Sequence, residues 1–152
     1  MCLAHAQRHA TLAFALKQEL QQLEAWHERF TARAEFAPHW AAGHARGFYR
    51  QAERILILLT WELHGKPVRG LNWPQRLLQE AAQEIAGVRP AVITAETQIA
   101  LQHFLTLRNW SRNIYGYDPH PRCLVWLMDE TRTLYPRFMH EVRLCREALF
   151  MF

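Results

Sequence analysis

Glycine and cysteine are scarce in this chain, which has six glycines and three cysteines among its 152 residues. Cys123 and Cys145 fall on one expected helical segment, so a bridge between them would need a sharp fold-back. Free thiols in a reducing compartment are the simpler interpretation. The first eight residues lack the apolar core of a signal peptide, and the longest aliphatic run, Ile55 to Leu59, is too short to cross a bilayer. The sequence therefore indicates a cytoplasmic protein without a membrane segment.

Several signatures of enzymatic sites are also missing from the sequence. It contains no glycine-rich phosphate loop, no Gly-x-Ser-x-Gly turn and no zinc-ligand spacing. Half of the residues are hydrophobic and the net charge is +4. This balance suits a helical globular protein, and it is compatible with an RNA or acidic-protein partner without requiring one. The length predicts a single domain over residues 1–152.

Apolar residues recur at three- and four-residue steps along most of the chain. This periodicity predicts an all-α fold, an up-and-down helical bundle of four long helices plus one short helix. Asn72 is expected to cap the short helix and Thr94 to begin the next, while Pro136 should kink or divide the last. The expected helices span 11–34, 38–64, 74–85, 94–115 and 122–150.

One polar cluster lies on the flank of an apolar stripe late in the sequence. At about 100° per residue, Arg108, Arg112 and Tyr115 fall within roughly 60° of one another, and Asn109 and Asn113 follow on the next strip. Guanidinium and amide groups so gathered could hold an anion. The same residues also fit a solvated helix face with a tyrosine at the edge of the core. The stripe itself consists of Ala100, His103, Phe104, Leu107, Trp110 and Ile114.

A second polar edge accompanies the apolar face of the predicted helix 38–64. Tyr49 and Glu53 lie one helical turn apart there, and Arg50 and Arg54 repeat that spacing beside them. An ordinary amphipathic edge would show the same pattern.

The stretch from Leu107 to Tyr117 resembles the active-site motif of the HepT-like ribonuclease toxins of the HEPN superfamily. That motif is an arginine, four to six spacer residues and a histidine, often with a tyrosine two positions on. Arg108 matches the arginine, Asn109 the polar residue that commonly follows it, and Tyr115 the tyrosine. Asn113 stands where the family has histidine. The resemblance extends from about residue 10 onward and includes Tyr49–Arg54, Trp73–Leu78 and Arg89–Ile93.

The resemblance implies a metal-independent RNA endonuclease that needs no cofactor. In such enzymes the ribose 2′-hydroxyl attacks its own phosphate, and Arg108 would stabilise the phosphorane with help from Arg112. Asn109 and Arg112 would contact the RNA phosphates. Asn113 cannot transfer a proton, because an amide does not titrate, so cleavage is expected to be weakened unless Tyr115 or a histidine of a second subunit takes that role.

The same resemblance implies two partners besides RNA. A nucleotidyltransferase antitoxin is expected to attach AMP to Tyr115, which would place negative charge beside Arg108 and Arg112. A homodimer is expected in which the two motif helices face one cleft. Two alternatives stay open: a non-catalytic HEPN module that uses Arg108, Arg112 and Asn113 to bind RNA, a nucleotide or an acidic protein, and a purely structural helical adaptor.

Overall fold

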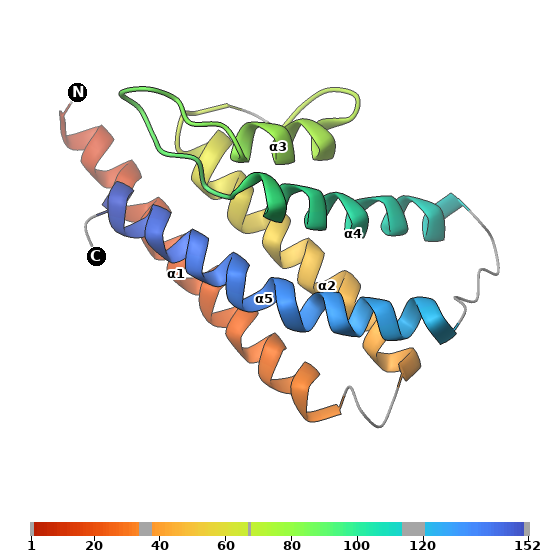
Figure 1. Ribbon diagram of the computed structural model, residues 1–152. Coiled ribbons are helices and arrows are strands. Elements are labelled where there is room, and N and C mark those ends of the chain that lie inside the picture. The colour runs from red at the N-terminus through yellow and green to blue at the C-terminus, as the bar shows by residue number, and fades with distance from the viewer. Residues whose placement is uncertain (1, 34–37, 67, 114–120, 151–152) are drawn as a thin grey trace.

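The computed structural model describes residues 2–33, 38–66, 68–113 and 121–150, and over these residues the fold is all-α (Figure 1). Four long helices and one short one are present, as the apolar periodicity predicts. None of these helices is long and apolar enough to cross a membrane. The helices are α1 (Cys2–Arg33), α2 (Pro38–Ile57) continued by a π-helical turn η1 (Leu58–Glu62), α3 (Trp73–Ala81), α4 (Ala95–Asn113) and α5 (Pro121–Phe150).

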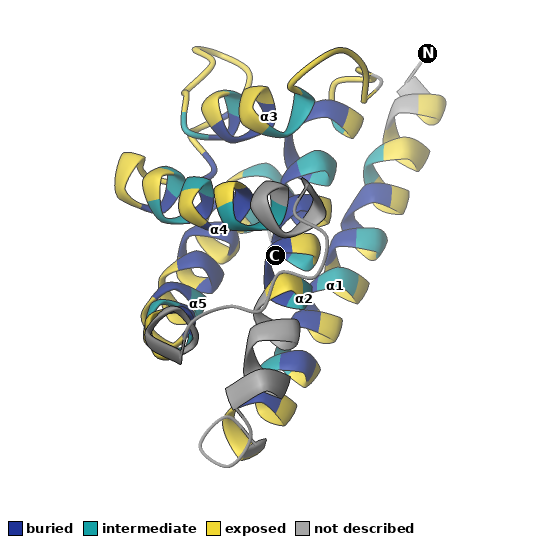
Figure 2. Cartoon of the chain, turned by 90° about the vertical axis from the view of Figure 1, so that its right-hand side faces the viewer, coloured by how far each residue is buried: buried dark blue, intermediate teal, exposed yellow. Residues whose placement is uncertain are grey.

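Successive long helices run in opposite directions, which confirms the predicted up-and-down bundle (Figure 1). α2 packs against both α1 and α5, and α4 packs across α2 and α5. α3 contacts α2 and α4 and covers one end of the bundle. Buried residues lie on the helix faces that turn toward one another (Figure 2). The largest fully buried side chains are Tyr49, Phe30, Phe48, Phe138, Leu16, Leu23, Ile55, Leu56, Leu59, Leu77, Leu78 and Ile93.

The first helix begins at Cys2, well before the predicted start at residue 11. Its early turns carry little apolar periodicity, and distant parts of the chain hold them instead. The Arg8 guanidinium donates a hydrogen bond to the Glu62 carbonyl at 2.9 Å. The His9 ring lies against the Phe150 ring, with centroids 4.6 Å apart. The first turns of α1 are thus held by the end of η1 and by the last residue of α5.

The second helix closes with a π-helical turn rather than with regular α-helix to residue 64. Thr60, inside this turn, donates its hydroxyl to the Leu56 carbonyl at 2.7 Å. The wider turn brings Trp61 into the core, where its indole nitrogen donates to the Glu80 carboxylate on α3. Trp73 packs partly buried beside it, with ring centroids 6.2 Å apart, as expected for an anchor of the loop before α3.

Three local expectations differ from the structure. Asn72 does precede α3, but its side chain makes no capping hydrogen bond, and it instead adopts a left-handed backbone with φ 58°. The left-handed conformation changes the direction of the backbone at the start of α3, without a capping contact from the Asn72 side chain. Pro136 does not divide α5, which continues through it as one helix, so of the two predicted outcomes the kink stays a prediction. His103 is exposed rather than part of the apolar stripe, and its ring lies against Trp126, with centroids 5.9 Å apart.

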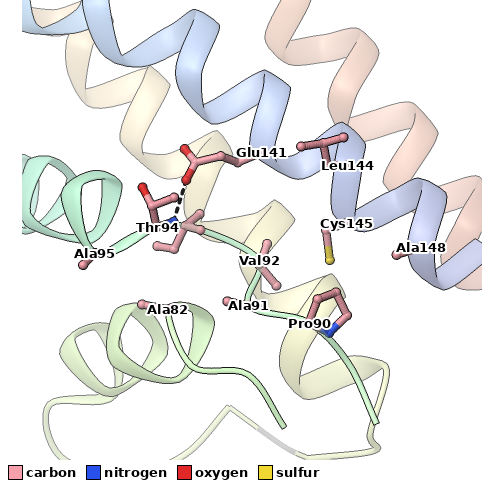
Figure 3. Close-up of a pocket in the computed structure, with 11 residues that line it drawn as sticks. Ala82, Pro90, Ala91, Val92, Thr94, Ala95, Glu141, Leu144, Cys145 and Ala148 are labelled. Atoms are coloured by element: carbon pink, nitrogen blue, oxygen red, sulfur yellow. Dashed lines mark hydrogen bonds between the residues drawn. The ribbon is translucent and has the colours of Figure 1, made fainter. Parts of the chain in front are cut away.

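The start of α4 is fixed by a buried carboxylate from α5. Glu141 accepts the Thr94 backbone N–H at 2.5 Å (Figure 3). Its other carboxylate oxygen accepts the Thr97 hydroxyl, also at 2.5 Å. The Thr94 hydroxyl in turn accepts the Thr97 backbone N–H at 3.3 Å, so Thr94 caps the helix as predicted. A negative charge at this end also complements the helix dipole. The network therefore ties the position of α4 to α5.

Candidate functional site

Arg108 on α4 and Glu53 on α2 form an ion pair at the border between core and solvent. The Arg108 Nη1 donates to both Glu53 carboxylate oxygens, at 3.2 and 3.3 Å. The Glu53 side chain is 9% exposed, whereas the Arg108 side chain is 20% exposed. The carboxylate thus belongs to the core, while part of the guanidinium side chain stays accessible from the solvent.

Tyr49 completes this group one helical turn before Glu53. Its ring is fully buried, and the Arg108 guanidinium carbon lies 5.5 Å from the ring centroid, within the range of a cation–π contact. Burial, together with the Glu53 carboxylate, raises the pKa of Tyr49 well above its ordinary value. The phenol therefore stays protonated and acts as an apolar wall for Arg108. Tyr49, Glu53 and Arg108 are called the arginine triad below.

The neighbouring core explains why these three residues meet. Phe48 directly precedes Tyr49, and Phe104 lies one turn before Arg108, and their rings pack with centroids 5.7 Å apart. Both rings are buried, so they fix α2 against α4 at this level. Glu53, five residues after Phe48, and Arg108, four residues after Phe104, meet beside this aromatic contact. The family resemblance places the polar edge of α2 near the motif helix, but the phase of the helices alone does not identify Glu53 as the partner of Arg108.

The other predicted site residues lie at the edge of what the structure describes. Asn109, Arg112 and Asn113 belong to the backbone of α4, but their side chains are outside the described part of the chain. Tyr115 lies outside the described residues altogether. Of the five predicted residues, Arg108 is therefore the one whose contacts are seen, and the convergence of the others with it stays a prediction.

A cavity of about 540 Å³ opens elsewhere, beside the N-terminal end of α4 (Figure 3). Arg108 lies thirteen helical steps after Ala95, or about 20 Å at 1.5 Å per residue. The lining is mostly apolar, and the Glu141 carboxylate within it is already engaged by Thr94 and Thr97. Among the described residues, no group of three acidic, histidine or cysteine side chains could hold a metal ion. The cavity is therefore separate from the arginine triad.

The fold and the triad together define a helical bundle that presents a core-anchored arginine at the border of its third long helix, α4. A protein-family model described as HepT-like protein matches residues 40–149 of the sequence, which include α3, α4 and nearly all of α2 and α5. The chain belongs to this HepT-like family. No curated protein and no solved structure matches it significantly. The matched region contains the whole arginine triad and all five predicted site residues.

Proposed function

We propose that this protein is the toxin of a HEPN/nucleotidyltransferase toxin–antitoxin pair and that it cleaves RNA without a metal ion. Membership of the HepT-like family supports the class of protein. The observation that carries the site is the partly exposed Arg108 held by the Glu53 carboxylate. A guanidinium group in this position suits the stabilisation of charge on a phosphate.

In the proposed reaction the ribose 2′-oxygen forms a bond to the adjacent phosphorus and loses its proton. The bond from phosphorus to the 5′-oxygen breaks, and that oxygen gains a proton. The products are a 2′,3′-cyclic phosphate and a 5′-hydroxyl. Arg108 stabilises the extra negative charge on the phosphorane between these two steps, with Arg112 and Asn109 contacting phosphate oxygens. Glu53 is a positioning residue, because it holds Arg108 and does not itself reach the reacting atoms in this scheme.

The identity of Asn113 decides how fast this reaction is. General acid–base catalysis contributes about 10²–10⁴ in rate, and an amide cannot supply it. The proposed enzyme is therefore slow, unless Tyr115 or a histidine of a second subunit moves the proton. Asn113, at the position where the family motif has histidine, is also the specific observation in favour of a second candidate function. This is a non-catalytic module that binds RNA, a nucleotide or an acidic protein through Arg108, Arg112 and Asn113.

Tyr115 is the proposed site of control by the antitoxin. The nucleotidyltransferase would transfer AMP from ATP to the phenol oxygen with release of pyrophosphate. The added phosphate would neutralise the cationic cluster that Arg108 and Arg112 form. Intact-mass measurement after co-expression should show one added AMP, and Tyr115→Phe should remove it. An AMP adduct that persists in Tyr115→Phe would refute this assignment.

Growth during expression tests the proposed toxin directly. Expression should arrest growth, and co-expression with a nucleotidyltransferase encoded beside the gene should restore it. Arg108→Ala should abolish the arrest, whereas Arg69→Ala, which changes an exposed arginine in the loop before α3, should leave it unchanged. An arrest that survives Arg108→Ala at equal protein levels would contradict the proposal. The homodimer with two motif helices facing one cleft remains part of this proposal and is tested by the mass of the purified protein in solution.

A further inference from the structure

Three arginines follow one another at four-residue steps on α2, and they differ in their partners. Arg54 forms an ion pair with Glu19 of α1 at 3.5 Å. Arg46 and Arg50 are exposed, and within the described part of the chain neither lies at ion-pair or hydrogen-bond distance from any acidic side chain. Among the described residues, therefore, no carboxylate neutralises either charge. The name Arg46–Arg50 ridge is used below for these two residues.

Helical geometry places the ridge beside the arginine triad. At about 100° per residue, Arg46 projects within about 20° of the direction of Glu53, and Arg50 within about 60°. Arg54 lies about 100° round the helix, toward α1, which agrees with its pairing to Glu19. Phe48, between Arg46 and Arg50, packs on Phe104 of α4, so the ridge lies along the part of α2 that passes beside the motif helix.

The charge of α2 supports an anionic partner along this line. Between Pro38 and Ile57 the sequence has three arginines and a single acidic residue, Glu53, which is already engaged by Arg108. Arg46 and Arg50 stand about 6 Å apart along the helix axis, at 1.5 Å per residue. A repeated anion such as a nucleic-acid backbone can meet both in turn and continue to Arg108.

We propose that Arg46 and Arg50 bind neighbouring phosphates of the RNA strand on which Arg108 acts. The inference rests on the proposed function and adds the path of the substrate along α2. An acidic protein partner is the competing occupant. The cores of protein interfaces are enriched in aromatic residues, whereas nucleic-acid interfaces are polar and strongly basic. None of the large exposed hydrophobic side chains in the described part of the chain belongs to α2, which favours RNA.

Binding of a fluorescein-labelled 2′-O-methyl oligouridylate to the full-length protein tests the ridge. This probe lacks the 2′-hydroxyl, so it cannot be cut by the proposed reaction during the measurement. Arg46→Gln and Arg50→Gln should each weaken the affinity by up to about fivefold, the range for a solvent-exposed ion pair. The slope of log affinity against log salt concentration should fall by about 0.7 for each lost phosphate contact. Arg54→Gln and Arg69→Gln are the matched controls, and both should change affinity and slope little.

The possible outcomes separate this inference from the proposed function. If Arg108→Gln weakens binding but the ridge variants match the parent, the path along α2 is wrong and the triad keeps its role. Equal losses in the ridge variants and in the Arg54 and Arg69 controls would also overturn the inference, because net charge alone would then explain binding. If the ridge variants lose binding to the antitoxin but keep the RNA affinity of the parent, the ridge belongs to the protein partner instead. A parent that does not bind the probe would refute both proposals.

Discussion

Removing the charge of Glu53 should weaken the fold by an amount that can be worked out from its contacts. Hydrogen bonds to charged groups contribute about 1.5–3 kcal/mol when they are buried. Here the Glu53 side chain is 9% exposed, but the Arg108 side chain is 20% exposed, so solvent screens the pair in part. We therefore expect Glu53→Gln to lower the free energy of unfolding by about 1–2 kcal/mol. The amide oxygen of glutamine keeps one weaker contact with Arg108, which limits the loss.

A double-mutant cycle isolates the contribution of this pair. Urea unfolding of the parent, Glu53→Gln, Arg108→Gln and the double variant can be followed by tryptophan fluorescence, since Trp26 and Trp61 are buried. The coupling energy should be about 1 kcal/mol, above the roughly 0.3–0.5 kcal/mol that separates independent sites. The pair of Arg54 and Glu19 provides the control, because the Arg54 side chain is 60% exposed and solvent screens it more strongly, and its coupling energy should lie below about 0.5 kcal/mol. A coupling at Glu53 no larger than in this control would refute the triad as the anchor of Arg108.

Three further results are expected from the structure. Glu141→Ala should lower the free energy of unfolding by about 2–4 kcal/mol, because two donors, the Thr94 N–H and the Thr97 hydroxyl, lose their acceptor, and Glu141→Gln should recover part of this in the same urea assay. Burial raises the pKa of Cys145 to about 11 from its ordinary 9.0, so the unfolded thiol ionises first. Stability should therefore fall by about 2–3 kcal/mol between these pH values, and a Cys145→Ala variant whose pH dependence matches the parent would contradict this. Asn113→His should raise RNA cleavage, up to about 10²-fold, and a decrease would mean that the asparagine has a positive role.

The number and order of the helices could be predicted because apolar spacing is a local property of the chain. Features that depend on contacts between residues far apart in the sequence could not be predicted in this way. The first turns of α1 have few apolar residues, and their helical state depends on Glu62 and Phe150, which no local pattern links to Arg8 and His9. The π-helical turn η1 escaped prediction for a related reason, since a single wide turn leaves the three- and four-residue spacing almost unchanged.

The candidate site likewise combines features that the local sequence predicts with features that depend on distant contacts. The phase of α4 predicts Arg108 on the flank of the apolar stripe, and the structure places it at the border of the core. Glu53 lies 55 residues away in sequence, so its contact with Arg108 depends on how α2 packs against α4. The signal that pointed to it was the one-turn spacing of Tyr49 and Glu53 beside a continuous apolar face. Arg50 and Arg54 lie one turn apart beside the same apolar face, so the sequence does not distinguish their roles. The structure does, because Arg54 forms an ion pair with Glu19.

The most direct test of the central proposal is the cleavage of an end-labelled RNA by the purified protein, in the presence of a chelator, with Arg108→Ala and Arg69→Ala measured alongside. The proposed mechanism predicts slow cleavage by the parent and by Arg69→Ala, products that end in 2′,3′-cyclic phosphate, and no cleavage by Arg108→Ala. Cleavage that continues at the parent rate in Arg108→Ala would contradict this mechanism. A parent that binds the RNA but never cuts it would also reject the nuclease and leave the binding module in its place.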